Sequence, residues 1–259
     1  MKRLATVLAV LALGACAELG IGDTRPVRII LVGDSTVAEG SGWGPAFCAH
    51  HVRAHVGCIN LGKGGASSGS YRAEGYWIKA QAEMVRDRGA RVFVLVQFGH
   101  NDQPGKPGRS TDLQAEFGPN MARYADEART AGVQPLLVTP LSRRQFKNGR
   151  VIEDLASWAA VMRKIAAQSH VPLLDLNADS TAALNDMGAV ASLRFAQAPA
   201  PTRVALAATT GTTIEAPKTG PKPVFDYTHL GPEGSEYFAA MVAREIEHAD
   251  TALAPYVVP

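Results

Sequence analysis

The sequence predicts an α/β fold in three layers, with a five-stranded parallel sheet between two layers of helices. Five short apolar segments, near residues 30, 59, 95, 137 and 174, alternate with segments of helical periodicity. Right-handed crossovers limit the topology of such a chain, and we expect the strand order 2-1-3-4-5. The 259 residues are 46% hydrophobic and 19% charged, which is enough apolar material for one sizeable core.

The expected strands are short apolar runs, of which the first three stop at Gly33, Gly62 and Gly99. This pattern is typical of strands buried on both faces. The strands cover residues 27–32, 57–62, 91–99, 134–140 and 171–176. Helices are expected at 44–55, from the glycine- and serine-rich loop to about 88, and at 112–131, 153–169 and 231–250.

Residues 196–223 interrupt this alternation, because they are rich in Ala, Thr, Pro and Gly. The segment is too long for an ordinary connection in a compact domain. We interpret it as an irregular insertion, either a mobile loop or a small hairpin, within a single domain that spans residues 24–259.

The first 15 residues predict a signal peptide. Lys2 and Arg3 precede a 12-residue apolar run, residues 4–15, which is shorter than the roughly 20 residues of a membrane-spanning helix. The following "LGAC" resembles a bacterial lipobox, which implies a mature chain that begins at a lipidated Cys16. Ordinary cleavage after Ala17 is the alternative. We therefore expect export, to the periplasm or outer membrane as a lipoprotein or into the medium, with any membrane contact made through Cys16.

The charge of the chain argues against nucleic-acid binding, and its cysteines raise the question of a disulfide. Without Lys2 and Arg3 the chain has 24 basic and 24 acidic residues, and no basic stripe indicates a nucleic-acid partner. In an exported protein Cys48 and Cys58 form either a short-range disulfide or two buried thiols, and the sequence leaves both open.

Residues suited to catalysis or ligand binding follow the expected strand ends, where open parallel sheets bind their ligands. They are Ser35, the glycines at 62, 64 and 65, Asn101, Arg143 with Arg144, and Asp226 with His229.

These residues supply the parts of a serine esterase. Ser35 offers the hydroxyl nucleophile, His229 the general base, and Asp226 a carboxylate that fixes the imidazole tautomer. The Ser35 N–H, a glycine-loop N–H and the Asn101 amide supply an oxyanion hole.

In this order the motifs resemble the four blocks of the SGNH (GDSL-type) hydrolases, over nearly the whole mature chain. "VGDST" carries Ser35, "NLGKGGASSGSY" the glycine, "FGHND" Asn101, and "DYTH" Asp226 with His229. The resemblance implies the flavodoxin-like SGNH hydrolase fold. Asn60, Gly65 and Ser67 fit the rhamnogalacturonan acetylesterase branch, which selects Gly65 as the oxyanion glycine.

This branch implies an O-acetylesterase of pectic rhamnogalacturonan that forms an acetyl-serine and needs no cofactor or metal. His100, Arg143 and Arg144 are candidate substrate-binding residues, the arginines for the carboxylates of a uronic-acid polymer. His51 and His55 lie four residues apart, as helical metal ligands do, but no third ligand accompanies them, and we expect a solvated helix face.

Two other functions remain open. The first is a lipase or thioesterase of the same family that acts on longer acyl esters, and the second is a surface lipoprotein that binds glycan without turnover. Acetylated xylan, exopolysaccharide and peptidoglycan also remain open as substrates.

Overall fold

A central parallel sheet organises the protein in the computed structural model, which describes residues 24–215, 224–249 and 252–259. Its strands are β1 (Val27–Gly33), β2 (Val56–Asn60), β3 (Arg91–Gln97), β4 (Gln134–Val138) and β7 (Leu173–Leu174). They pair in parallel in the order β2-β1-β3-β4-β7. This confirms the predicted order, with β7 as the fifth strand of the sheet.

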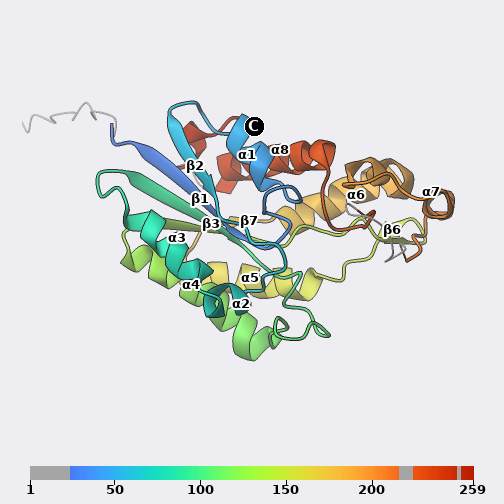
Figure 1. Cartoon of the computed structure of the whole chain (residues 1–259), viewed down its shortest axis with the longest axis horizontal. Coiled ribbons are helices and arrows are strands. Elements are labelled where there is room, and N and C mark those ends of the chain that lie inside the picture. The colour runs from blue at the N-terminus through green and yellow to red at the C-terminus, as the bar shows by residue number, and fades with distance from the viewer. Residues whose placement is uncertain (1–23, 216–223, 250–251) are drawn as a thin grey trace, which may run out of the picture.

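Helices cover both faces of the sheet (Figure 1). One layer holds α1 (Gly44–His50), α6 (Leu176–Ser192) and α8 (Pro232–Ala249). The other holds α2 (Ser70–Ala73), α3 (Tyr76–Val85), α4 (Gly118–Thr130) and α5 (Ala156–Ser169). Alternate residues of β1 enter the two cores: Ile29 and Leu31 pack in the core that includes α8, and Ile30 and Val32 in the core that includes α4. Because both faces are buried, the strands read as continuous apolar runs.

Several expected boundaries differ from the structure. The helix expected at 44–55 ends at His50, and Val52 pairs with Val257 in an isolated bridge. His51 is buried, with its Nδ1 2.7 Å from the Val258 carbonyl oxygen. The expected solvated helix face is therefore wrong for His51, whereas His55 is exposed but lies beyond the end of α1. The helix expected to end near 88 is divided into α2 and α3 at Gly75, whose φ of +78° suits glycine.

The segment at 196–223 contains a helix, α7 (Thr202–Ala208), where we expected irregular chain or a hairpin. A short hairpin occurs earlier instead, between β5 (Phe146–Lys147) and β6 (Arg150–Val151). A π-helical turn at Leu113–Phe117 leads into α4, and 3-10 turns lie at Leu193–Phe195 and Ala254–Tyr256. Residues 216–223 lie outside the described residues, as do the expected signal peptide at 1–15 and Cys16.

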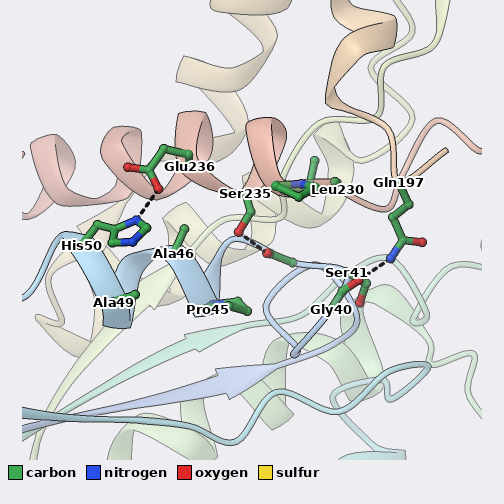
Figure 2. A pocket seen from close by; sticks show the side chains of 13 residues that line it. Gly40, Ser41, Pro45, Ala46, Ala49, His50, Gln197, Leu230, Ser235 and Glu236 are labelled. Carbon is green, nitrogen blue, oxygen red and sulfur yellow. Dashed lines mark hydrogen bonds and ion pairs between the residues drawn. The ribbon is translucent and has the colours of Figure 1, made fainter. Parts of the chain in front are cut away.

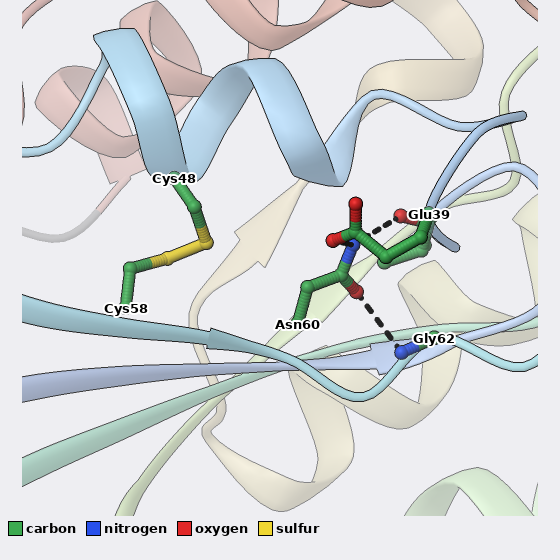
Figure 3. The surroundings of a disulfide bond; sticks show 6 residues. Glu39, Cys48, Cys58, Asn60 and Gly62 are labelled. Atoms are coloured by element: carbon green, nitrogen blue, oxygen red, sulfur yellow. Dashed lines mark hydrogen bonds between the residues drawn. A yellow bond between two sulfur atoms is a disulfide. The ribbon is translucent and has the colours of Figure 1, made fainter.

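Cys48 of α1 and Cys58 of β2 form a disulfide, with their Cα atoms 5.4 Å apart (Figure 3). The bond resolves the alternative that the sequence left open, and it ties α1 to the outer strand of the sheet. In the described part of the chain, no helix is both long and apolar enough to cross a bilayer.

Candidate active site

The turn after β1 places Ser35 at the carboxyl edge of the sheet. Gly33 ends the strand where a Cβ would lie 2.5 Å from a methyl carbon of Val37, so only glycine fits. Asp34 then closes the turn, because its Oδ1 accepts hydrogen bonds of 2.8 Å from both the N–H and the hydroxyl of Thr36. The composition of this segment indicates a turn, and the structure has a turn there. This turn presents Ser35 to the pocket.

Ser35, His229 and Asp226 form one hydrogen-bonded chain. His229 Nε2 lies 3.0 Å from Ser35 Oγ, and His229 Nδ1 lies 2.6 Å from Asp226 Oδ2. The other oxygen of Asp226 accepts bonds of 2.7 Å from the backbone N–H groups of Thr228 and His229. With Nδ1–H donating to the carboxylate, Nε2 is the acceptor that faces the serine hydroxyl.

The carboxylate of Asp226 is stabilised in its charged form. Burial alone would raise its pKa, but the hydrogen bond and charge of His229, together with the bonds from the backbone N–H groups, lower the pKa below its ordinary value. Asp226 is therefore suited to hold an imidazolium, which is the form that His229 takes after it accepts a proton.

Arg144 holds the loop that carries Asp226 and His229. It is 1% exposed, and its Nη2 donates to the carbonyl oxygens of Asp226 at 2.9 Å and His229 at 3.0 Å. Burial lowers the pKa of Arg144 to about 10, and the nearby charge of Asp226 opposes this shift, so the side chain is charged at neutral pH. The prediction that Arg144 contacts substrate is wrong, because its guanidinium is buried against backbone carbonyls.

The loop after β2 presents two unused backbone donors. Gly62 N–H bonds to Asn60 Oδ1 at 3.0 Å, a contact visible in Figure 3, and Lys63 N–H bonds to the Gly33 carbonyl at 2.9 Å. Within the described chain, the N–H groups of Gly64 and Gly65 have no acceptor. Gly65 has a φ of +81°, which other residues rarely adopt. Both glycines line the pocket that contains Ser35.

Asn101 completes this group of donors. Its Nδ2 donates to the Ala66 carbonyl at 2.9 Å, which uses one of two amide hydrogens and leaves the other for the pocket. The Ser35 N–H is also without an acceptor among the described residues. Ser35, Gly65 and Asn101 therefore offer three N–H donors around one pocket, the arrangement that binds an oxyanion.

Asp102 joins the two loops that carry these donors. It is fully buried and accepts hydrogen bonds from Ser68 Oγ at 2.6 Å and Thr111 Oγ1 at 2.8 Å. Burial raises the pKa of Asp102 to about 6, although these bonds favour the charged form. The carboxyl group thus positions the glycine loop relative to Asn101 and does not face the pocket.

His100 lies behind the site and does not contact the pocket. It is 2% exposed, and its Nδ1 is 3.4 Å from Asp34 Oδ2. Burial alone would raise the pKa of Asp34, but His100 and Thr36 lower it below its ordinary value. The prediction that His100 binds substrate is wrong. The pair instead joins the residue before Ser35 to the residue before Asn101.

The pocket above Ser35 has a volume of about 950 Å³ and is lined mainly by polar residues. Arg143 lines it and is fixed by a 3.1 Å bond to Thr228 Oγ1 and an ion pair with Asp154. The sequence did not identify several other wall residues, which are Arg109, Gln145, Gln197, Glu215, Phe225 and Tyr227. Gln197 and Glu215 come from the 196–223 segment, so the described part of this insertion contributes to the pocket wall. The cations in "GKPGR", two residues after the Asn101 block, were a signal for Arg109.

A second pocket of about 650 Å³ lies between α1 and the start of α8 (Figure 2). Its lining is mainly apolar, with Pro45, Ala46 and Leu230, and ends at the His50–Glu236 pair. A 2.9 Å bond from the Leu230 N–H to the Ser41 carbonyl lies in the wall between this pocket and the catalytic one. Among the described residues, no group of three or more His, Cys, Asp or Glu side chains can hold a metal ion.

Comparison with known proteins agrees with this geometry. Residues 31–237 match the GDSL-like Lipase/Acylhydrolase family. Rhamnogalacturonan acetylesterase RhgT of Bacillus subtilis is 32% identical over 242 residues, covering 90% of this chain and 95% of that protein. Probable rhamnogalacturonan acetylesterase YesY of the same organism is 33% identical over 168 residues, covering 62% of this chain and 75% of that protein.

Solved structures share the fold at lower identity. YxiM of Bacillus subtilis superposes with a TM-score of 0.66 at 20% identity, over 88% of this chain and 58% of YxiM, so this chain spans less than two thirds of that protein. A variant of Axe2, an acetyl xylan esterase from Geobacillus stearothermophilus, has a TM-score of 0.55 at 15% identity, over 86% and 95% of the two chains. The chain therefore belongs to the GDSL-like lipase/acylhydrolase family, has the SGNH hydrolase fold and is a carboxylic ester hydrolase.

Proposed function

We propose that this protein removes O-acetyl groups from a carbohydrate, with pectic rhamnogalacturonan as the substrate. The observation that carries the proposal is the chain of hydrogen bonds from Ser35 through His229 to Asp226, at 3.0 and 2.6 Å, in a pocket lined mainly by polar residues. The choice of substrate is supported by RhgT and YesY, which carry that substrate in their names.

In the proposed mechanism, His229 Nε2 accepts the hydroxyl proton of Ser35 while Oγ attacks the acetyl carbonyl carbon. The carbonyl oxygen becomes an oxyanion and is held by the N–H donors of Ser35, Gly65 and Asn101. His229 then gives its proton to the departing sugar oxygen, which leaves an acetyl-serine. A water molecule, deprotonated by His229, attacks this ester and releases acetate, and Ser35 recovers its proton.

The apolar pocket in Figure 2 favours one second candidate, an esterase of longer acyl chains. An acyl chain bound to Ser35 would have to pass the wall at Ser41 and Leu230 to reach that pocket. The acetylesterase proposal predicts that the rate falls from p-nitrophenyl acetate to p-nitrophenyl laurate. A rate that rises with chain length would contradict it.

The substrate is tested by acetate release from acetylated rhamnogalacturonan, acetylxylan and acetylated peptidoglycan. We expect the largest kcat/KM on rhamnogalacturonan and no release by Ser35→Ala. A matched control is Ser169→Ala at the end of α5, which should retain full activity. Binding of glycan without acetate release would favour the non-catalytic alternative, and equal rates on the three polymers would contradict the choice of substrate.

We also propose that the chain is exported and carries a lipid on Cys16, on the basis of its N-terminal sequence. The intact mass of the protein extracted from membranes tests this. A mature chain that begins after Ala17 without lipid would contradict it.

A further inference from the structure

The loop between Asp102 and Thr111 is held by its own hydrogen bonds and brings Arg109 to the wall of the catalytic pocket. Ser110 Oγ accepts a 2.8 Å bond from the Lys106 N–H and donates a 2.8 Å bond to the Gln103 carbonyl. The Thr111 N–H closes the loop with a 3.0 Å bond to the Asp102 carbonyl. The cations on this loop therefore hold defined places relative to the site.

Arg109 extends from this loop over the glycine loop. Its Nη1 lies 2.9 Å from the position that a Cβ on Gly65 would occupy, and Arg109 lines the pocket together with Gly65 and Asn101. A Cβ at position 65 would therefore displace the guanidinium from its observed place. Arg109 lies beside the proposed oxyanion hole.

Two further cations surround this position. Lys106 Nζ lies 3.4 Å from Asn101 Oδ1, and Arg143 lines the neighbouring wall. Burial and the charges of Arg143 and Arg109 lower the pKa of Lys106, as expected for cations held close together. Asp154 neutralises Arg143, but within the described residues no carboxylate lies at ion-pair distance from Arg109.

We propose that Arg109, with the charge of Lys106 near it, is an anion subsite that binds a carboxylate of the substrate next to the acetylated position. The inference rests on the proposed function and assigns the recognised group: a uronic-acid carboxylate on the sugar that bears the ester or on its neighbour. A guanidinium suits this group, because its fork of N–H donors matches the two oxygens of a carboxylate. The subsite distinguishes acidic glycans from neutral ones such as xylan.

The test compares Arg109→Gln with wild type on acetylated polyuronate oligosaccharides and on acetylated xylo-oligosaccharides. We expect kcat/KM on the acidic substrate to fall about twofold to fivefold, the effect of one solvent-exposed ion pair, and kcat/KM on the neutral substrate to be unchanged. Arg88→Gln makes the same change of charge at an exposed position beyond the end of α3, and it should affect neither substrate.

Two measurements on the wild type support the same test without a variant. Raising the salt concentration should lower kcat/KM on the acidic substrate and leave the neutral substrate unaffected, since salt screens exposed charges. Methyl esterification removes the negative charge of the uronate carboxyls, so it should also lower kcat/KM on the acidic substrate. The inference is overturned if Arg109→Gln leaves the ratio of kcat/KM on the acidic substrate to kcat/KM on the neutral substrate unchanged. It is also overturned if methyl esterification of the uronate carboxyls leaves this ratio unchanged. Failure of the proposed function is a different result, because wild type would then release no acetate from either glycan.

Discussion

Replacement of Arg144 by methionine should damage both stability and catalysis, although Arg144 does not reach the pocket. The guanidinium is 1% exposed and donates to the carbonyl oxygens of Asp226 and His229 at 2.9 and 3.0 Å. A third bond, of 3.4 Å, reaches the Thr228 carbonyl. Methionine fills part of the volume but offers no donor, so these buried carbonyls lose their partners.

The magnitude follows from the two shorter bonds. Each buried acceptor left without a donor costs about 1–3 kcal/mol, and apolar contacts of methionine recover part of this, which gives a net loss of about 2–4 kcal/mol in the free energy of unfolding. The same loop carries His229, whose Nε2 must stay 3.0 Å from Ser35 Oγ. A displacement of about 1 Å costs on the order of 100-fold in rate, and we expect this loss in kcat.

The assay combines urea unfolding with p-nitrophenyl acetate kinetics. Arg144→Met should lower the urea midpoint and kcat while KM changes little, and Arg144→Lys should give intermediate values because one ammonium cannot span three carbonyls. Arg150→Met, at an exposed position of β6, is the control and should resemble wild type. An Arg144→Met variant with the wild-type midpoint and kcat would refute the reasoning.

Further predictions concern the other parts of the site. Asn101→Ala should lower kcat about 100- to 1000-fold with little change in KM, since it removes one oxyanion donor; a change in KM alone on p-nitrophenyl acetate would contradict this. Because the pKa of Asp226 is depressed, its contribution to stability is present above pH 3.8 and lost as pH falls through the lower folded value. Asp226→Asn should therefore lower the unfolding free energy at pH 7 by more than in strong acid; equal losses at both pH values would contradict this. Cys48→Ser/Cys58→Ser opens a loop with a sequence separation of 10 and should cost about 2.5 kcal/mol with kcat unchanged; an unchanged melting temperature would contradict this.

The parallel sheet and the convergence of the site residues could both be predicted from the sequence, because both follow from the geometry of a buried parallel sheet. Parallel strands with both faces buried are apolar throughout, and they place their carboxyl ends at one edge. Ser35 and Asn101 could therefore be assigned to one pocket from their positions after β1 and β3. Asp226 and His229 followed from their position before the last helix.

Other features depend on contacts that no local pattern contains. Arg144 and His100 have the residue types of ligand-binding groups, and only the packed structure shows that both are buried. The expected helix at 44–55 is cut short because Val52 pairs with Val257, about 200 residues away. The hairpin between β5 and β6 had a local signal that we did not use, an Asn148–Gly149 turn in which both residues have positive φ.

The central claim is that Ser35 becomes acetylated during turnover, and mass spectrometry tests it most directly. Wild-type enzyme mixed with p-nitrophenyl acetate is quenched in acid after a few turnovers, and the peptide that contains Ser35 is examined for one added acetyl group. Our account predicts this acetyl group on Ser35 in wild type and its absence in Ser35→Ala, which should also release no acetate. Acetate release by Ser35→Ala at the wild-type rate, or turnover with the acetyl group on another residue, would contradict it.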